Sequence, residues 1–235
     1  MTARLARRLL AEYLGSALLA ALVIGSGIAA AQLSQDTGLQ LLENAAATAA
    51  GLFAIILMFG PISGAHFNPV VSLVDAAFGG ISRRDALAYI PAQIAGCITG
   101  AVVANGMFAL TAISISTHHR ASPSHLFAEV IATCGLILVI FALVRSGRAA
   151  TAPAAVGAYI GAAYWFTSST SFANPAISIG RIFSDTFAGI APASVPAFVV
   201  AQLVGGAFAI GIAWFLYPDL PADAVVVPHD DAEPA

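Results

Sequence analysis

Charged side chains are scarce in this chain of 235 residues: Asp, Glu, Lys and Arg make up only 9 %, and lysine is absent altogether. Soluble domains usually carry about 25 % charged residues, because a surface that faces water needs them. Hydrophobic residues make up 59 % of the sequence, and the mean hydropathy is +0.89. These values exclude a soluble enzyme, a nucleic-acid-binding protein and a disordered chain. The composition predicts an integral membrane protein that lies in a lipid bilayer.

Cysteine is also scarce, and the two that occur, Cys97 and Cys134, both lie in apolar runs. The chain therefore needs no disulfide framework, and neither cysteine indicates a redox compartment. The apolar runs contain no nucleophile–base pair and no residues with metal-ligand spacing, so the sequence predicts no enzyme, no cofactor and no metal site. His118, His119 and His125 cluster in one loop. A plain loop is favoured there over a metal site, because no carboxylate or cysteine stands beside them.

Long apolar runs make up most of the sequence. A membrane helix needs about 20 mostly apolar residues, and six runs qualify, at about 9–31, 44–60, 86–110, 125–144, 151–167 and 194–217. Two further runs, 68–78 and 174–184, have half that length, and each opens with an Asn-Pro pair. Proline suits the first helical position, and the Asn before it caps the free backbone amides. The sequence predicts an all-α protein with six spans and two short helices that begin at Asn68 and Asn174.

Arginine placement predicts the orientation in the membrane. Seven of the nine arginines fall on one side of a six-span arrangement: Arg4, Arg7, Arg8, Arg83, Arg84, Arg145 and Arg148. The positive-inside rule then puts both termini in the cytoplasm, and the acidic segment 218–235 is expected to be a solvated cytoplasmic tail. A cleavable secretory signal is the alternative interpretation of the first run. The length of that run and Glu12 within it argue against cleavage.

The two halves of the chain repeat each other weakly. Glu12 and Glu129 open the first and fourth spans, and Ala-Gln-x-x-Gly segments recur at 92–96 and 201–205. Each half holds three spans and one short helix, and because three is odd the second half must lie upside down relative to the first. Inverted repeats of this kind place a solute path near the membrane midplane, where the short helices meet. We therefore expect one membrane domain over 1–217, with inverted repeats at about 9–110 and 125–217.

The segments that open the two short helices resemble a known family. Ser63-Gly64-Ala65-His66-Phe67-Asn68-Pro69-Val70 and Asn174-Pro175-Ala176 are similar to the paired Asn-Pro-Ala boxes of the aquaporin (major intrinsic protein) family, with Val70 in place of the usual alanine. This resemblance implies six transmembrane helices, two re-entrant half-helices and a passive channel. It also implies a homotetramer in which each subunit has its own pore, and a pore lined by Asn68 and Asn174.

The resemblance further implies a constriction on the outer side of the pore. Family spacing from the two boxes places it at Thr48, Ala162, Ser171 and Ile177. Water-selective and glycerol-conducting members resemble each other in having an aromatic residue and an arginine in this set. Because this chain has neither, we expect a wider filter without the five hydrogen-bond donors of an arginine.

This filter is similar to that of bacterial members linked to arsenic resistance, which also lack the arginine. The expected solutes are glycerol-sized polyols and neutral metalloid acids such as arsenous acid, with some water, across the bacterial inner membrane. The alternatives are a water-selective aquaporin and an ion-coupled secondary transporter.

Acidic residues within the spans are costly and usually have a role. Glu12 and Glu129 are expected to accept hydrogen bonds from the backbone of the re-entrant loops, with a proton relay as the alternative. His66 is expected to line the pore or to brace its loop, and a pH-sensing role is the alternative.

Two charged residues lie seven positions after the boxes, Asp75 after Asn68 and Arg181 after Asn174, and they are candidates for the pore mouths. Arg181 either replaces the missing filter arginine in part or binds a loop carbonyl or Asp185. Asp75 lies near the negative end of its helix, which disfavours an acid. We therefore expect it either to pair with Arg83 or Arg84 or to have a role in the vestibule of the pore.

Overall fold

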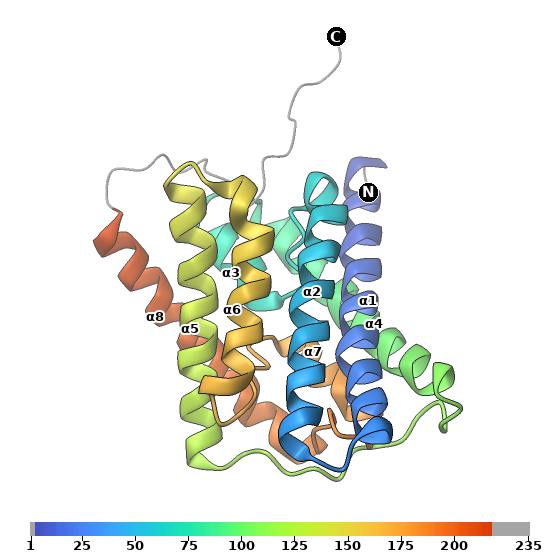
Figure 1. Ribbon diagram of the computed structural model, residues 1–235. Coiled ribbons are helices and arrows are strands. Elements are labelled where there is room, and N and C mark those ends of the chain that lie inside the picture. The colour runs from blue at the N-terminus through green and yellow to red at the C-terminus, as the bar shows by residue number, and fades with distance from the viewer. Residues whose placement is uncertain (1–2, 218–235) are drawn as a thin grey trace.

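The computed structural model describes residues 3–217, and these fold into a bundle of helices with no β-strand among them (Figure 1). The eight α-helices are α1 Ala3–Leu33, α2 Thr37–Ser63, α3 Pro69–Phe78, α4 Arg83–Met107, α5 Pro123–Arg145, α6 Ala152–Phe166, α7 Pro175–Gly180 and α8 Val195–Leu216. Three short 3₁₀ turns are η1 Ala149–Thr151, η2 Arg181–Phe183 and η3 Pro192–Ser194. The expected acidic tail, 218–235, lies outside the described residues.

Five of the described helices, α1, α2, α4, α5 and α8, are long and apolar enough to cross a membrane. The remaining expected span, about 151–167, corresponds to α6, which has 15 residues. At 1.5 Å per residue its length is about 22 Å, shorter than the hydrocarbon core of about 30 Å. The helix is short because η1 precedes it and because the chain leaves it at Thr167 to enter the second re-entrant loop.

The two short helices begin where the Asn-Pro pairs predict. Asn68 and Asn174 are extended N-cap residues whose side-chain oxygens accept hydrogen bonds from the first turn, with proline at the first helical position. The first helix, α3, ends at Gly79, which has φ 86°, a left-handed conformation that glycine adopts without steric strain. The second, α7, has only 6 residues and continues as the 3₁₀ turn η2.

The two halves have the same internal arrangement. In the first, α1 packs against α2 and α4; in the second, α5 packs against α6 and α8. The halves join through contacts between α2 and α6, α3 and α8, and α4 and α7. The first and last helices of each half approach closely: a Cβ at Gly96 would lie 2.3 Å from the carbonyl oxygen of Tyr13, and one at Gly205 would lie 2.5 Å from that of Val130.

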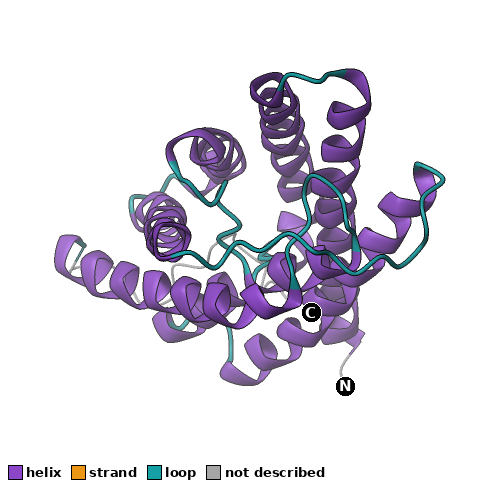
Figure 2. Cartoon of the chain, turned by 90° about the horizontal axis from the view of Figure 1, so that it is seen from below, coloured by secondary structure: helices purple, strands orange, loops and turns teal. Residues whose placement is uncertain are grey.

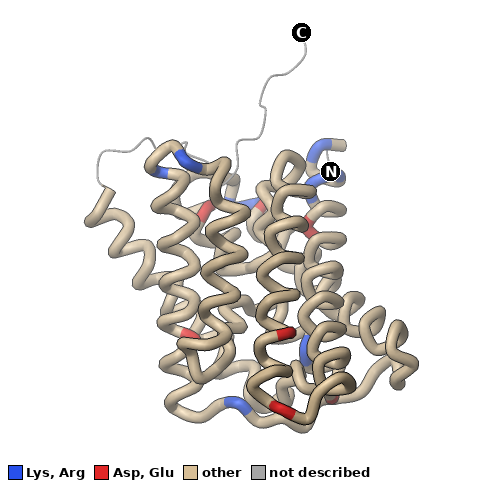
Figure 3. Tube along the Cα trace, in the orientation of Figure 1, with Lys and Arg blue, Asp and Glu red and all other residues tan. Residues whose placement is uncertain are grey.

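Charge and loops distinguish the two ends of the bundle. Most of the arginine segments lie at the end where α1 begins, which is also the end of the α5–α6 connection (Figure 3). At the opposite end, the segment 108–122 crosses the bundle from α4 to α5 (Figure 2). We call this segment the outer strap. It is held by hydrogen bonds from Ser114 N to the Phe183 carbonyl, 3.2 Å, and from Ser116 N to the Ile182 carbonyl, 2.8 Å.

Candidate functional site

The two re-entrant segments meet at the centre of the bundle through a crossed pair of hydrogen bonds. The side-chain amide of Asn68 donates to the carbonyl of Ala173, and that of Asn174 donates to the carbonyl of Phe67, both at 2.7 Å. The side-chain oxygens accept from the first turns of α3 and α7. Each amide nitrogen carries two N–H groups, so one N–H of each asparagine is not used in these bonds.

A cavity runs between the two halves and past both asparagines. Of the residues predicted for the site, the cavity is lined by Asn68, Asn174, Thr48, Ser171, Ile177, His66 and Arg181. Most of the other lining residues are aliphatic: Leu19, Val23, Leu52, Ile56, Val71, Leu136, Ile140, Val156 and Ile160. The remaining residues of the two boxes are buried: Pro69, Val70, Pro175 and Ala176.

One filter position is wrong. Ala162 is exposed on α6, whereas the cavity-lining residues of this helix are Ala152, Val156, Ile160 and Tyr164, which recur every four residues. In a helix with 3.6 residues per turn, a position two residues from Ile160 points about 200° away from it. The family spacing therefore selected the outward face of α6, and the four-residue spacing along the helix was the signal that identifies its inward face.

The expectation of a filter without aromatic residues is also wrong. Tyr164 and Phe172 both line the cavity, and the Tyr164 hydroxyl lies 3.2 Å from the Thr48 hydroxyl. Phe172 lies two residues before Asn174, in the position that His66 occupies relative to Asn68. The family spacing selects neither aromatic residue, although the equivalence with His66 in the repeat identifies Phe172 as a lining residue.

Arg181 is buried and lines the cavity beside these aromatics. Its guanidinium carbon lies 3.4 Å from the centre of the Phe172 ring, and its Nε donates to the carbonyl of Ala188. Arg120 of the outer strap lies over the same ring at 5.5 Å. Asp185, the other partner considered for Arg181, instead accepts from the backbone N–H of Thr117 at 2.9 Å. Arg181 therefore binds a loop carbonyl and also faces the cavity.

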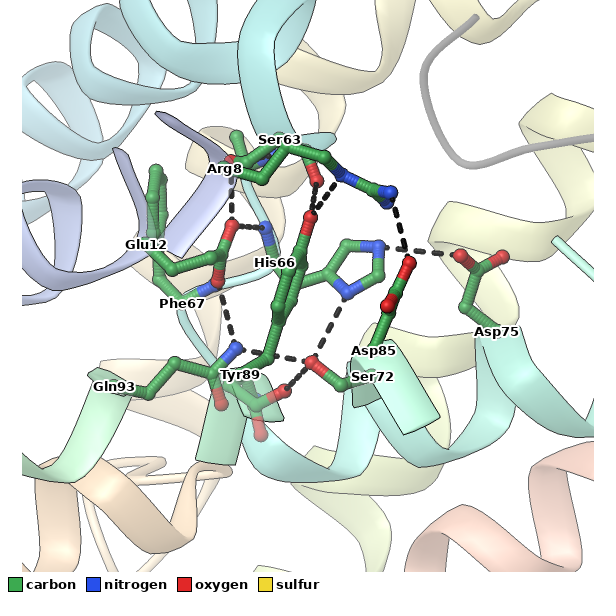
Figure 4. A network of polar contacts seen from close by, with 12 residues as sticks. Arg8, Glu12, Ser63, His66, Phe67, Ser72, Asp75, Asp85, Tyr89 and Gln93 are labelled. Carbon is green, nitrogen blue, oxygen red and sulfur yellow. Dashed lines mark hydrogen bonds and ion pairs between the residues drawn. The ribbon is translucent and has the colours of Figure 1, made fainter. Parts of the chain in front are cut away.

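Glu12 is fully buried and holds the first re-entrant loop (Figure 4). Its carboxylate accepts hydrogen bonds from the Ser63 hydroxyl at 2.6 Å, from the backbone N–H groups of His66 and Phe67 at 3.0 and 2.8 Å, and from the Gln93 amide at 2.7 Å. Because these donors satisfy both carboxylate oxygens, they offset the desolvation of the buried charge.

Glu129 has the equivalent contacts in the second half. It accepts from the backbone N–H groups of Phe172 and Ala173 at 2.9 and 2.8 Å and from the Gln202 amide at 2.6 Å. Gln93 and Gln202 come from the recurring Ala-Gln-x-x-Gly segments, which explains why these segments repeat.

The expected pairing of Asp75 with Arg83 or Arg84 is wrong. Both arginines are exposed, whereas Asp75 is fully buried and pairs with His66, whose Nε2 lies 3.3 Å from its Oδ2 (Figure 4). The arginines lie at the start of the next helix, α4, where they face solvent. The arginine that does enter this region is Arg8, which donates to the Tyr89 hydroxyl at 2.7 Å.

The sequence also matches a known family. Residues 1–181 match the sequence model of the family described as "Major intrinsic protein". The chain belongs to the major intrinsic protein family. Membership makes it a multi-pass membrane channel and not an enzyme.

Relatives within the major intrinsic protein family cover almost the whole chain. Aquaglyceroporin AqpS of Rhizobium meliloti (strain 1021) is 48 % identical over 218 residues, which cover 92 % of this chain and 93 % of AqpS. Aquaporin Z of Brucella melitensis biotype 1 is 31 % identical over 214 residues, 84 % of this chain and 92 % of that protein. The X-ray structure of the aquaglyceroporin from Plasmodium falciparum matches with a TM-score of 0.74 at 21 % identity, covering 91 % of this chain and 98 % of that one. This last likeness concerns the fold alone.

Proposed function

We propose that the chain is a passive channel for small uncharged solutes of about the size of glycerol. The observation that carries the proposal is the cavity itself, which passes two asparagine amides and is otherwise lined mainly by aliphatic side chains. Such a lining suits a solute with both a hydrocarbon skeleton and hydroxyl groups. The name of AqpS, an aquaglyceroporin at 48 % identity, supports the same class of solute.

The two half-helices account for the exclusion of cations. α3 and α7 start at Pro69 and Pro175, beside the two asparagines. A helix N-terminus carries a partial positive charge of up to about half an elementary charge, so both ends oppose a cation at the centre of the pore. Neutral solutes do not experience this barrier.

At the outer side, we propose that Arg181 takes part in the filter although Ile177 occupies the family's arginine position. Arg181 and Phe172 stack at the cavity wall, and Thr48, Ser171 and Ile177 complete this region. The filter then contains an arginine and two aromatics, but in an arrangement different from that of the family pattern. Glycerol-sized polyols and neutral metalloid acids such as arsenous acid remain the proposed solutes, together with some water.

A water-selective channel is the second candidate. Tyr164 and Phe172 add two aromatic side chains to the cavity lining that the sequence analysis did not expect, and the 31 % identity to an Aquaporin Z agrees with this alternative. The two candidates differ in one measurable property, the permeability to glycerol relative to water.

The cellular setting is part of the proposal. We infer one channel domain over 1–217 in the bacterial inner membrane, with both termini in the cytoplasm and with four identical subunits. The arginine-rich end of the bundle supports this orientation, because basic loops remain cytoplasmic.

The test is stopped-flow light scattering on liposomes that contain the purified protein, with water, glycerol, urea and arsenous acid as solutes. We expect glycerol and arsenous acid fluxes well above those of empty liposomes. Ile177→Arg should lower glycerol flux by about tenfold or more while affecting water less, because the new guanidinium narrows the cavity and faces Arg181 with like charge. Ile177→Leu is the matched control. Water flux without glycerol flux in the unmodified protein would favour the second candidate.

A further inference from the structure

Each Asn-Pro box has an interacting pair of side chains at equivalent positions, two residues before and seven residues after the asparagine. In the second half the pair is Phe172 and Arg181, with 3.4 Å between the guanidinium carbon and the ring centre. In the first half it is His66 and Asp75, with 3.3 Å between Nε2 and Oδ2. Both members of the second pair line the cavity, whereas in the first pair only His66 does. The positions that build the outer filter therefore have a counterpart in the cytoplasmic half.

Both ring nitrogens of His66 point at neighbouring side chains (Figure 4). Nε2 faces the carboxylate of Asp75, and Nδ1 lies 3.0 Å from the hydroxyl of Ser72. The contact with Asp75 lacks hydrogen-bond geometry, but a lone pair on Nε2 would face the negative carboxylate, so Asp75 favours the form of His66 with a proton on Nε2, in which Nδ1 accepts from the Ser72 hydroxyl. Among the described residues, the cavity wall includes His66 but neither Asp75 nor Ser72.

Two further helices, α1 and α4, also contact His66. The Tyr89 ring of α4 lies edge-on at 5.4 Å between centroids, and Glu12 of α1 accepts the backbone N–H of His66. Asp75 is fully buried, and neither of its carboxylate oxygens has a hydrogen-bond partner among the described residues. Asp75 therefore acts on the pore wall through its contact with the His66 ring.

We propose that Asp75 is a positioning residue that sets solute selectivity in the cytoplasmic half of the pore. It holds His66 with both nitrogens turned away from the solute, so that the ring contributes an apolar surface beside Ile56, Val71 and Ile140. Solutes that need hydrogen bonds at every step, water above all, gain nothing from His66, whereas a polyol keeps its dispersion contacts with the wall. The inference rests on the proposed function, permeation of small neutral solutes.

The test measures the ratio of water to glycerol permeability in the same liposome assay. Asp75→Ala frees the Nε2–H of His66 to donate to a solute, and we expect the ratio to rise by about two- to tenfold, the effect of one hydrogen bond. Asp75→Asn keeps an acceptor oxygen and should restore the unmodified ratio. The double variant H66F/D75A should also restore it, because it has no free nitrogen and matches the phenylalanine of the second half.

A pair of serine variants gives an independent comparison. Ser72 and Ser178 occupy equivalent places in their halves: each hydroxyl oxygen lies near the carbonyl of its box asparagine, at 3.2 and 2.9 Å, and accepts from the amide of Gln93 or Gln202 at 3.0 Å. Only Ser72 also contacts a histidine. Ser72→Ala should therefore raise the ratio by about two- to threefold, whereas Ser178→Ala should not raise it.

The outcomes separate the two proposals. Absence of glycerol flux in the unmodified protein refutes the proposed function. Glycerol flux together with an unmodified ratio in folded Asp75→Ala overturns the positioning role, as does Asp75→Asn behaving like Asp75→Ala. If Asp75→Ala is not recovered as a folded protein, the serine pair decides, and equal ratios in Ser72→Ala and Ser178→Ala overturn the role.

Discussion

Buried carboxylates in this bundle differ in what surrounds them. Glu12 and Glu129 each receive backbone N–H groups from a re-entrant loop and an amide from a glutamine. An unsatisfied backbone N–H within a membrane costs several kcal/mol, so each glutamate makes a non-helical loop tolerable at this depth. Glu and Gln recur along the sequence because each half has a re-entrant loop whose backbone N–H groups need an acceptor.

Replacing Glu129 by glutamine tests this role. The new amide group would point a donor at Phe172 N–H or Ala173 N–H, which now donate to the carboxylate at 2.9 and 2.8 Å. A stranded donor costs about 1–3 kcal/mol, so we expect the thermal midpoint to fall by about 3–10 °C. Differential scanning fluorimetry in detergent measures this shift.

Glu43→Gln is the control, because the Oε2 atom of Glu43 is buried and has no hydrogen-bond partner among the described residues. It should leave the midpoint within about 1 °C, as expected for a change that breaks no contact. An equal fall in both variants would refute the loop-holding role of Glu129.

Sequence reasoning at this scale worked where a residue acts locally. Asn68 and Asn174 cap the helices that they precede, and an Asn-Pro pair states that chemistry by itself. It failed for Asp75, because the partner lies on a non-helical loop before the helix, while the expected arginines, at a similar separation in sequence, face solvent. A backbone path with positive φ at Ala65 and Phe67 brings His66 to Asp75, and no periodicity predicts such a path.

At the scale of elements, the contact between α1 and α4 depends on glycine. A Cβ at Gly100 would lie 2.1 Å from the carbonyl oxygen of Ala17, a separation that the two helix backbones cannot maintain. The same holds at Gly96, one turn earlier on α4. Small residues allow helices in a membrane to approach closely, where dispersion contacts rather than the hydrophobic effect hold them together.

Gly100→Ala should therefore separate α4 from α1 and lower stability by about 1–3 kcal/mol, the usual effect of overpacking. Gly106→Ala on the same helix is the matched control, because a Cβ there meets nothing within 4 Å. Thermal unfolding of the two variants in the same detergent provides the comparison. If both unfold at the midpoint of the unmodified protein, the close approach is not needed for stability.

The outer strap should loosen in acid. The backbone N–H of Thr117 holds the pKa of the Asp185 carboxyl below its ordinary value. A lowered pKa in the folded state means that the contact stabilises the strap above about pH 4, the ordinary pKa, and is lost as the pH falls through the lowered value. We expect the amide of Thr117 to lose protection from hydrogen exchange as the pH falls below about 4, after correction for the intrinsic rate.

Asp185→Asn provides the control for this titration, since its amide oxygen accepts the same hydrogen bond but does not titrate. Protection at Thr117 should then be independent of pH over the same range. Constant protection in the unmodified protein would show that Asp185 does not hold the strap.

The element boundaries were predictable to the extent that composition determines them. Apolar length located α1, α2, α4, α5 and α8, and the Asn-Pro pairs located α3 and α7. The inward face of α6 was not predictable from the spacing used, because that spacing assumes the same number of residues between the inward positions of α6 and Asn174 in every member of the family. The repeat of Val156, Ile160 and Tyr164 was the better guide.

At the scale of the whole molecule, two inverted halves enclose a cavity between them. Inverted repeats also occur in secondary transporters, which rock one part against another. Here the crossed bonds between Asn68 and Ala173 and between Asn174 and Phe67 tie the halves together at the centre. This connection favours a fixed pore over alternating access.

Solute flux should therefore not respond to an ion gradient. We expect glycerol permeability of the liposomes to change by less than about twofold, within the scatter of one weak interaction, when a proton or sodium gradient is imposed or collapsed with an ionophore. Empty liposomes under the same gradients are the control. Uphill accumulation of glycerol driven by either gradient would make the protein a transporter.

The crossed bonds also bear on how the protein is made. The ribosome delivers the N-terminal half first, and until Ala173 and Asn174 follow, the Asn68 amide and the Phe67 carbonyl lack the partners that they have in the finished fold. A chain that stops after α4 therefore carries unpaired polar groups at the centre of the bundle. We expect the cell to degrade such a chain. Conversely, two halves expressed separately, with the chain divided within 108–122, each carry the hydrogen-bonding groups that the other half needs. Co-expression of the two halves should therefore restore a pore, which neither half forms alone.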